Sequence, residues 1–300
     1  MKKKLKYLII FSIIIAIIGF IGINNIAPYA VIMPPRVHEN TTPADLGLES
    51  ENIEISLEDT VKMKGYWIES KQDTAKGILV LLHGIGGCKE HYLNLCKELS
   101  EKGIITVIYD GRAHGVSGGE YCTFGYKEKE DISKLLDFIK EKEPNLPLGI
   151  WGNSLGGAIA IQALEHDKRI EFGIIESTFA ELKEIVYQYQ KRLSKGIGMR
   201  WVSNHVLKRA GEIGGFDPEK VRPIESVKNI EQPMFISHGD ADENINFKFG
   251  KALFDNLKSK DKEFVKVEGA GHNNLFVIGG EEYKNKLMKF ISRHFERNIN

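Results

Sequence analysis

One serine in this sequence stands in a setting that could make it a nucleophile. Ser154 lies at the centre of Gly152-Asn153-Ser154-Leu155-Gly156, after an apolar run typical of a buried strand and before a helical Ala/Ile/Leu pattern. A tight turn between strand and helix holds such a hydroxyl out of the sheet, and the first N–H groups of the helix point at an anion forming beside it. The same five residues also suit an ordinary glycine-rich turn, so the rest of the chain must decide between the two interpretations.

A nucleophilic serine needs a base that takes its proton and an acid that orients the base. Candidates for both follow later apolar runs: Asp240 and Asp242 come after one of them, and His272 lies in a glycine-rich loop after the last one. Ser154, Asp242 and His272 occur in this chain order, each beyond a predicted strand. Three other histidines lie at strand ends or in loops, and we interpret them as loop-ordering residues: His83, His114 and His238.

The elements that must position these residues alternate along the chain. Residues 52–57 and 61–68 alternate apolar with polar and predict an antiparallel hairpin. A continuous apolar run typical of a strand buried on both faces lies at 77–83, and further strands, separated by amphipathic helical patterns, are predicted at 104–109, 148–151, 170–175, 234–238 and 263–267. This rhythm predicts an α/β fold with a mostly parallel, doubly wound sheet, in which ligands gather beyond the carboxyl ends of the strands. Ser154, Glu176 and the loops after His83 and Asp110 fall at those ends.

A longer connection lies between the predicted strands at 170–175 and 234–238. Residues 179–210 form an amphipathic helical pattern with several aromatic residues, and 211–223 are rich in glycine and proline. We interpret about 180–230 as an insertion that forms a small helical lid over the site. Ordinary surface helices packed on the sheet are the alternative.

The N-terminus carries four lysines within its first six residues, followed by a nearly pure apolar run over 7–23. A run of this length is near the lower limit for crossing a bilayer, and the lysines favour the cytoplasmic side. We expect a signal-anchor transmembrane helix over 1–24, a linker or extended arm without helix over 25–50, and the folded domain over 51–300, outside the cell membrane. Secretion after cleavage of a signal peptide is the alternative, although Ala27-Pro28-Tyr29-Ala30 matches a cleavage site poorly.

The composition argues against several classes of function. The 300 residues carry 41 basic and 41 acidic side chains, so no net field favours nucleic acid. Cys88, Cys96 and Cys122 form no C-x-x-C pair and predict small buried thiols rather than a disulfide framework or a zinc site. We expect neither a nucleic-acid partner nor a metal.

Taken together, these features resemble the α/β-hydrolase superfamily over about 50–297. Within it, the chain is most similar to the group of monoacylglycerol lipases and serine-aminopeptidase-like hydrolases. Besides the pentapeptide around Ser154 and the Gly271-His272 pair, the resemblance is carried by His83-Gly84-Ile85-Gly86-Gly87, Asp110-Gly111-Arg112-Ala113-His114-Gly115 and Gly239-Asp240-Ala241-Asp242. It implies an α/β-hydrolase fold, with a mostly parallel doubly wound sheet and a small helical lid insertion, preceded here by the transmembrane helix.

The resemblance also implies a role for individual residues. Ser154 corresponds to the nucleophile and His272 to the general base. Asp242 corresponds to the acid, because the family pattern Gly-x-x-Asp-x-x-apolar fits 239–245.

Two other acidic residues lie close to these positions. Asp240 would tie the loop by side-chain hydrogen bonds, and Glu176 is the alternative acid. The oxyanion hole would consist of the backbone N–H groups of Leu155 and Ile85. No metal or organic cofactor is implied.

The chemistry implied by the resemblance is acyl transfer through an acyl-enzyme on Ser154. We expect a membrane-anchored serine hydrolase that cleaves carboxylic esters, which could be small molecules or lipids. A serine peptidase or an acyltransferase is the alternative within enzymes, because the same three residues serve all of them. A membrane-anchored binding module without catalysis is the alternative from another class.

Overall fold

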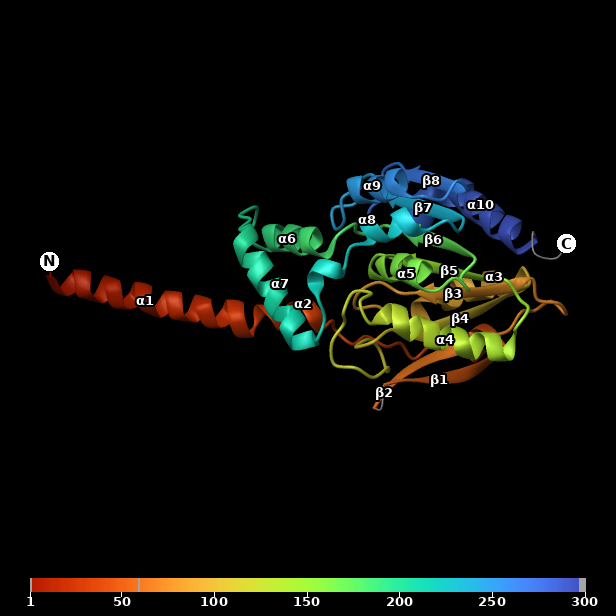
Figure 1. Ribbon diagram of the computed structural model, residues 1–300, viewed down its shortest axis with the longest axis horizontal. Coiled ribbons are helices and arrows are strands. Elements are labelled where there is room, and N and C mark those ends of the chain that lie inside the picture. Colours follow the sequence, from red (N-terminus) through yellow and green to blue (C-terminus); the bar gives the residue numbers. More distant parts are fainter. Residues whose placement is uncertain (1, 59, 297–300) are drawn as a thin grey trace.

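The computed structural model describes residues 2–58 and 60–296. Within these residues, eight strands form one sheet in the order β1-β2-β4-β3-β5-β6-β7-β8 (Figure 1). β1 pairs antiparallel with β2, and β2 with β4, whereas all other neighbours are parallel. The strands are β1 Ser50–Glu58, β2 Val61–Ile68, β3 Gly77–Leu82, β4 Ile104–Asp110, β5 Leu148–Asn153, β6 Phe172–Glu176, β7 Met234–Gly239 and β8 Lys262–Val267. This mostly parallel sheet confirms the predicted fold class.

Helices cover both faces of the sheet, and each face has its own apolar core. In β3, Ile78 and Val80 belong to the core shared with α4 and α5, whereas Leu79 and Leu81 belong to the core shared with α3 and α10. Successive side chains of a strand point to opposite faces, so a continuous apolar run is what a doubly covered strand requires. The helices on the sheet are η2 Lys89–Tyr92, α3 Leu93–Glu101, α4 Glu128–Lys142, α5 Leu155–His166, α9 Lys248–Asn256 and α10 Leu275–Glu296.

The strand order reverses next to β3. The chain leaves β3 for β4 on one side and later returns to β5 on the other side. β3 and β5 are therefore neighbours, and Leu82 is paired in register with Gly152. Open α/β sheets bind ligands at such a switch point, beyond the carboxyl ends of the strands. Ser154 lies there, immediately after β5.

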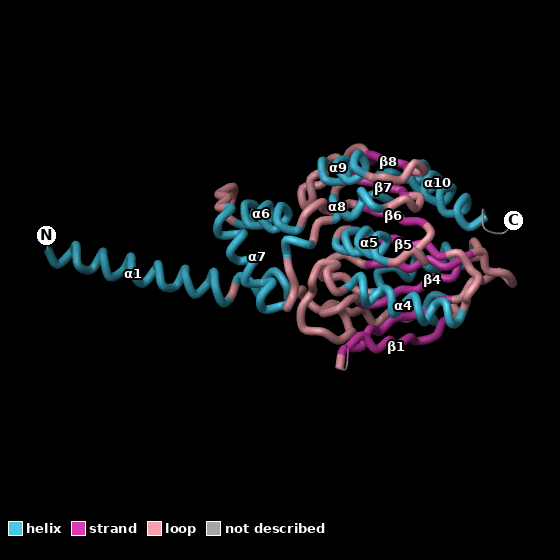
Figure 2. Tube along the Cα trace, in the orientation of Figure 1, coloured by secondary structure: helices cyan, strands magenta, loops and turns pink. Residues whose placement is uncertain are grey.

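The connection between β6 and β7 carries the predicted insertion. The sequence predicts a continuous helical pattern over 179–210, but the structure corrects this, because the chain turns at 194–199. Lys195 and Gly196 have φ angles of 52° and 99°, which a right-handed helix does not contain. The resulting helical hairpin stands between α1 and the sheet (Figure 2). The elements of the connection are α6 Leu182–Leu193, α7 Arg200–Gly214, η3 Pro218–Lys220, α8 Pro223–Ser226 and η4 Val227–Asn229.

The N-terminal segment departs most from the prediction. α1, Lys2–Asn25, projects from the domain, and its C-terminal end reaches α7 and α2 (Figure 1). The prediction that 25–50 contains no helix is wrong, since α2 spans Ala27–Ile32 and η1 spans Pro43–Leu46. Pro28 lies in the first turn of α2 and Pro43 begins η1, where the N–H that proline lacks would have no helical partner.

Among the described residues, one helical stretch is long and apolar enough to cross a membrane. It spans Lys3–Ile32, its most apolar window has a mean hydropathy of 2.5, and none of that window is buried. A helix that exposes isoleucine, leucine and phenylalanine on all sides suits either a membrane anchor or a signal sequence.

Candidate active site

Ser154 sits on a strained turn between β5 and α5. Its φ and ψ are 54° and −118°, a conformation that residues other than glycine rarely adopt. A Cβ on Gly152 would lie 2.2 Å from the Gly156 carbonyl oxygen, and one on Gly156 would lie 2.1 Å from the Leu82 carbonyl oxygen. Both glycines are therefore required for the close approach of strand, turn and helix. The backbone is held by hydrogen bonds from Ser154 N–H to Glu176 O (2.9 Å) and from Thr178 Oγ1 to Ser154 O (2.6 Å).

The three residues singled out from widely separated loops meet at this turn. His272 Nε2 lies 3.0 Å from Ser154 Oγ, and His272 Nδ1 lies 2.8 Å from Asp242 Oδ2. With a proton on Nδ1, the ring donates to the carboxylate and accepts from the hydroxyl. Ser154 and Asp242 are each 6% exposed, so the chain of hydrogen bonds is largely shielded from water. A base aligned in this way can take a proton from the serine.

Asp242 is held as a carboxylate. Its Oδ1 accepts hydrogen bonds from the N–H groups of Asn244 and Ile245, both at 2.8 Å. Burial raises the pKa of Asp242, but hydrogen bonds from His238, His272 and Ile245 outweigh burial and hold this pKa far below its usual value. The carboxylate is therefore charged throughout the neutral pH range, as the orienting acid of a histidine must be.

His238 is a contact of Asp242 that the sequence interpretation missed. This fully buried residue of β7 places Nε2 3.3 Å from Asp242 Oδ2 and 2.8 Å from the Ile245 carbonyl oxygen. A proton on Nε2 bridges the carboxylate to the backbone of the same loop. The signal in the sequence was the spacing of four residues between His238 and Asp242 across the end of the strand.

The other two acidic candidates face elsewhere. Asp240 Oδ1 accepts the Gly269 N–H at 2.7 Å, which ties the loop after β7 to the loop after β8. Glu176 Oε2 accepts from Trp151 Nε1 at 2.8 Å, and its Oε1 accepts from the Tyr283 hydroxyl. Burial raises the pKa of Glu176. Of the three acids, Asp242 is the one hydrogen-bonded to His272.

The two residues predicted to form the oxyanion hole lie next to Ser154 in the chain and in the loop after β3. Leu155 is the first residue of α5, so its N–H has no acceptor within the helix. Gly84 approaches from the loop after β3, and a Cβ built there would lie 3.3 Å from Ser154 Cβ. This loop turns back through a hydrogen bond from Gly87 N–H to Gly84 O (3.0 Å). Ile85 and Leu155 both border the cavity that contains Ser154.

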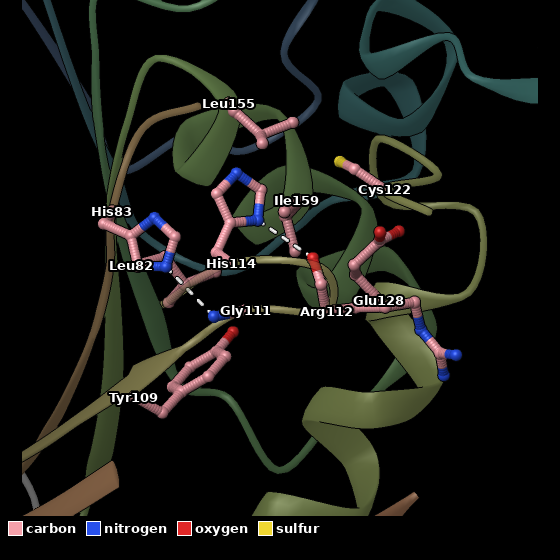
Figure 3. Close-up of a pocket in the computed structure, with 10 residues that line it drawn as sticks. All are labelled: Leu82, His83, Tyr109, Gly111, Arg112, His114, Cys122, Glu128, Leu155 and Ile159. Carbon is pink, nitrogen blue, oxygen red and sulfur yellow. Dashed lines mark hydrogen bonds between the residues drawn. The ribbon is translucent and has the colours of Figure 1, made fainter. Parts of the chain in front are cut away.

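His83 and His114 are neighbours in a small pocket that Leu155 also lines, and both bond to the backbone of the loop after β4 (Figure 3). His83 Nε2 accepts the Gly111 N–H at 3.0 Å, its Nδ1 donates to Gly84 O at 2.8 Å, and His114 Nδ1 donates to Arg112 O at 2.9 Å. Burial lowers the pKa of His83 to about 4, and the neighbouring His114 adds to this. His83 is thus a neutral link between the loops after β3 and β4, in keeping with the loop-ordering interpretation.

Two cavities meet at the site. The first, which we call the apolar cavity, has a volume of about 550 Å³ and contains Ser154. Its other walls include α6, α7, the end of α1 and helix α2. The second, which we call the polar cavity, has a volume of about 600 Å³ and contains His272, Asn153 and Asn273. Ile85 borders both, so the serine and the histidine face different compartments.

The three cysteines and the other potential metal ligands form no second functional site among the described residues. Cys88, Cys96 and Cys122 are buried and free, which confirms the expected small buried thiols. Burial raises the pKa of Cys88 to about 11, so its thiol stays protonated. Within the described parts of the chain, no group of three His, Cys, Asp or Glu side chains could hold a metal ion.

A mostly parallel sheet of this order, with a serine on a strained strand-to-helix turn and acidic and histidine loops after later strands, defines an α/β hydrolase. The solved structure of the Pyrococcus furiosus esterase Pf2001 has the same fold, with a TM-score of 0.73 and 28% sequence identity. The match covers 88% of this chain and 98% of that one.

The particular family follows from the sequence. A family model described as serine aminopeptidase, S33 (Hydrolase_4) matches residues 73–225, about half of the chain. The chain belongs to this family. The match runs from just before β3 to α8, and so includes the serine turn and most of the insertion.

Two curated relatives extend the similarity beyond the region of the family model. The uncharacterized protein YqkD of Bacillus subtilis is 26% identical over 236 residues, covering 76% of this chain and 75% of YqkD. The lysophosphatidylserine lipase ABHD12 of Xenopus tropicalis is 25% identical over 246 residues, covering 75% of this chain and 60% of that protein. The match thus spans less than two thirds of the length of this lipase.

Proposed function

We propose that this protein is a membrane-anchored serine hydrolase that cleaves carboxylic esters of single acyl chains through an acyl-enzyme on Ser154. The observation that carries the proposal is the hydrogen-bonded chain from Ser154 Oγ to His272 (3.0 Å) and from His272 to Asp242 (2.8 Å). The similarity to an esterase and to lysophosphatidylserine lipases supports an ester as the substrate.

In the first half of the reaction, His272 Nε2 takes the proton of Ser154 Oγ as the oxygen attacks the ester carbonyl carbon. The electron pair of the C=O bond moves to the oxygen, and the N–H groups of Ile85 and Leu155 hold the oxyanion. When the tetrahedral intermediate collapses, the bond to the alcohol oxygen breaks. His272 gives its proton to this alcohol, and the acyl group stays on Ser154.

In the second half, water attacks the acyl carbonyl while His272 accepts one of its protons. Collapse of the second tetrahedral intermediate returns this proton to Ser154 Oγ and releases the carboxylic acid. Asp242 keeps its charge throughout, and it holds the Nδ1 proton of His272 and stabilises the imidazolium form. The low pKa of the carboxylate supports this role.

The two cavities divide the substrate between them. His272 protonates the leaving alcohol and borders the polar cavity, so this cavity takes the alcohol part. Ser154 carries the acyl group and opens into the apolar cavity, which is lined mainly by aliphatic and aromatic side chains. Each methylene buried there contributes about 0.8 kcal/mol. A long acyl chain with a polar head group is the ester that fits both compartments.

The character of the apolar cavity favours an esterase over an aminopeptidase. A substrate with a free N-terminal ammonium would bring a positive charge to the acyl side of the cleaved bond. The residues that line the apolar cavity include no carboxylate to pair with it. Burying an unpaired charge among apolar side chains is costly, so peptides are the poorer substrates.

We propose that α1 remains as a single membrane span, with the N-terminal lysines in the cytoplasm and the hydrolase domain outside. The exposed apolar surface of α1 and the lysines at its start support this topology. Protease added to intact cells should digest the domain and leave a tag at the N-terminus intact. Protection of the domain would refute the topology.

A panel of substrates tests the activity. We expect hydrolysis of p-nitrophenyl esters, a rise of kcat/KM with acyl length, and little release of p-nitroaniline from aminoacyl anilides. Ser154→Ala should reduce ester hydrolysis by about 10⁴-fold or more. Faster turnover of the anilides would favour the peptidase, and equal rates for the wild type and Ser154→Ala would refute the proposal.

A further inference from the structure

We infer that the membrane anchor is part of the substrate site: the end of α1 and helix α2 form one wall of the apolar cavity and set the length of acyl chain that it accepts. This inference rests on the proposed function. It assigns a binding role to residues that the sequence analysis interpreted only as an anchor and as a linker or extended arm.

The lining of the apolar cavity carries the inference. Ile23, Ala27, Ala30 and Val31 border the same cavity as Ser154. The other walls are supplied by α6 and α7, through side chains that include Ile185, Tyr189, Val202 and Val206. A chain esterified to Ser154 therefore extends between the lid hairpin and the end of the anchor.

The position of α2 is fixed by contacts on its domain side. Ile32 is fully buried in the core, and its carbonyl oxygen accepts the Cys122 N–H at 2.9 Å. Just beyond α2, the Arg36 guanidinium donates to four carbonyl oxygens of the loop after β4, those of His114, Gly115, Ser117 and Gly119. The segment that forms this wall is thus held by the apolar core and by the loop after β4.

The end of α1 is joined to the lid as well. Asn24 Oδ1 lies 2.9 Å from His205 Nε2 of α7. Ile23 is the last residue of the apolar run over 7–23, so the cavity begins where this run ends. A single-chain lipid in the outer leaflet at this level meets the cavity wall directly, and its acyl chain can pass into the cavity without crossing bulk water.

Small side chains in this wall leave the room that the acyl chain needs. Ala27 and Ala30 both face the apolar cavity, and a phenyl ring at either position would occupy part of its volume. Ala16 lies on the exposed surface of α1 and borders none of the cavities at the site, so the same substitution there serves as a matched control.

The test compares long and short substrates in the full-length protein, in detergent. We expect Ala27→Phe and Ala30→Phe to lower the ratio of kcat/KM for p-nitrophenyl dodecanoate to that for p-nitrophenyl butanoate by about tenfold or more. Ala16→Phe should keep the wild-type ratio. A ratio unchanged in both variants, or lowered as much by Ala16→Phe, would overturn the inference.

A second variant covers the case in which a phenylalanine prevents folding. Ile23→Ala enlarges the cavity, so we expect the optimum of the chain-length profile to shift toward longer esters. An unshifted optimum would contradict the proposal that the end of α1 forms part of the acyl-chain site. If the wild type hydrolyses no ester, the proposed function itself is refuted. If the wild type is active but none of these variants changes its preference for acyl length, only the role of the anchor is refuted.

Discussion

The two walls of the site are built by different means. The inner wall consists of loops at the carboxyl edge of the sheet, where backbone hydrogen bonds and close glycine contacts hold Ser154 and Asp242, and side-chain hydrogen bonds join His272 to both. The outer wall consists of α6, α7 and the junction of α1 with α2, which meet the apolar cavity mainly through aliphatic side chains. The inner wall fixes the positions of individual atoms, whereas the outer wall determines the shape of the apolar cavity.

This difference separates two properties of the enzyme. Bond cleavage depends on distances of about 3 Å between hydrogen-bonding atoms, which a rigid sheet edge maintains. Choice of acyl chain depends on apolar volume, to which many side chains contribute a little each. Substitutions in the inner wall should therefore change kcat for every ester, whereas substitutions in the outer wall should change the preference among esters.

The largest effect is expected in the inner wall, at Asp242. Asp242→Asn removes the charge that selects the tautomer of His272, and we expect kcat to fall by about 10⁴-fold for long and short esters alike. Asp240→Asn is the matched control: Asp240 bonds to Gly269 rather than to His272, so its variant should keep the wild-type kcat. If both variants lose activity equally, the assignment of the acid is wrong.

The next prediction concerns His83, which links the loops after β3 and β4 in the inner wall. The pKa of His83 is lowered to about 4, so the unfolded chain binds a proton below pH 6.5 that the folded protein does not. Stability due to His83 is therefore complete above pH 6.5 and is lost as the pH falls toward 4. Urea unfolding between pH 7.5 and 4.5 should give a flatter pH dependence for His83→Gln than for the wild type. Parallel curves would contradict this account.

In the outer wall, a charge in α7 should act on long substrates. Val206 borders the apolar cavity, and Val206→Lys would place an ammonium group beside the acyl chain. We expect the ratio of kcat/KM for dodecanoate to that for butanoate to fall by about tenfold. Asn204→Lys adds the same charge to an exposed position of α7 and should leave the ratio unchanged. An equal loss of kcat/KM for esters of all chain lengths in Val206→Lys would contradict the proposed division of roles between the two walls.

The smallest effect is expected where the arm meets the loop after β4. Arg36→Ala removes hydrogen bonds to four carbonyl oxygens, and we expect the free energy of unfolding to drop by about 1 kcal/mol, because the side chain is partly solvated. The drop should be smaller in Arg222→Ala, whose guanidinium makes exposed ion pairs with Glu181 and Glu225. Equal stability of Arg36→Ala and the wild type would show that the arm is held elsewhere.

The sequence predicts the inner wall far better than the outer one. The elbow around Ser154 needs two glycines at fixed positions, and Asp242 and His272 lie in loops that follow predicted strands. These signals are local, because each one reflects the backbone geometry of a few neighbouring residues. Chain order then sufficed to bring them to one edge of a parallel sheet.

The outer wall depends on contacts between distant segments. Prolines at 28, 34 and 35 suggest an extended arm, but Pro28 falls in the first turn of α2, and burial of Ile32 in the core stabilises that helix. The turn at 194–199 interrupts a pattern that is helical on both sides. The contact of His238 with Asp242 likewise appears only once β7 and its following loop are folded together.

The central claim is that Ser154 forms the covalent intermediate, and labelling of the full-length protein with a fluorophosphonate followed by peptide mapping tests it most directly. We predict one phosphonylated peptide with the adduct on Ser154, slower labelling in Asp242→Asn at neutral pH, and none in Ser154→Ala. An adduct on another residue, or equal labelling of Ser154→Ala and the wild type, would contradict the mechanism.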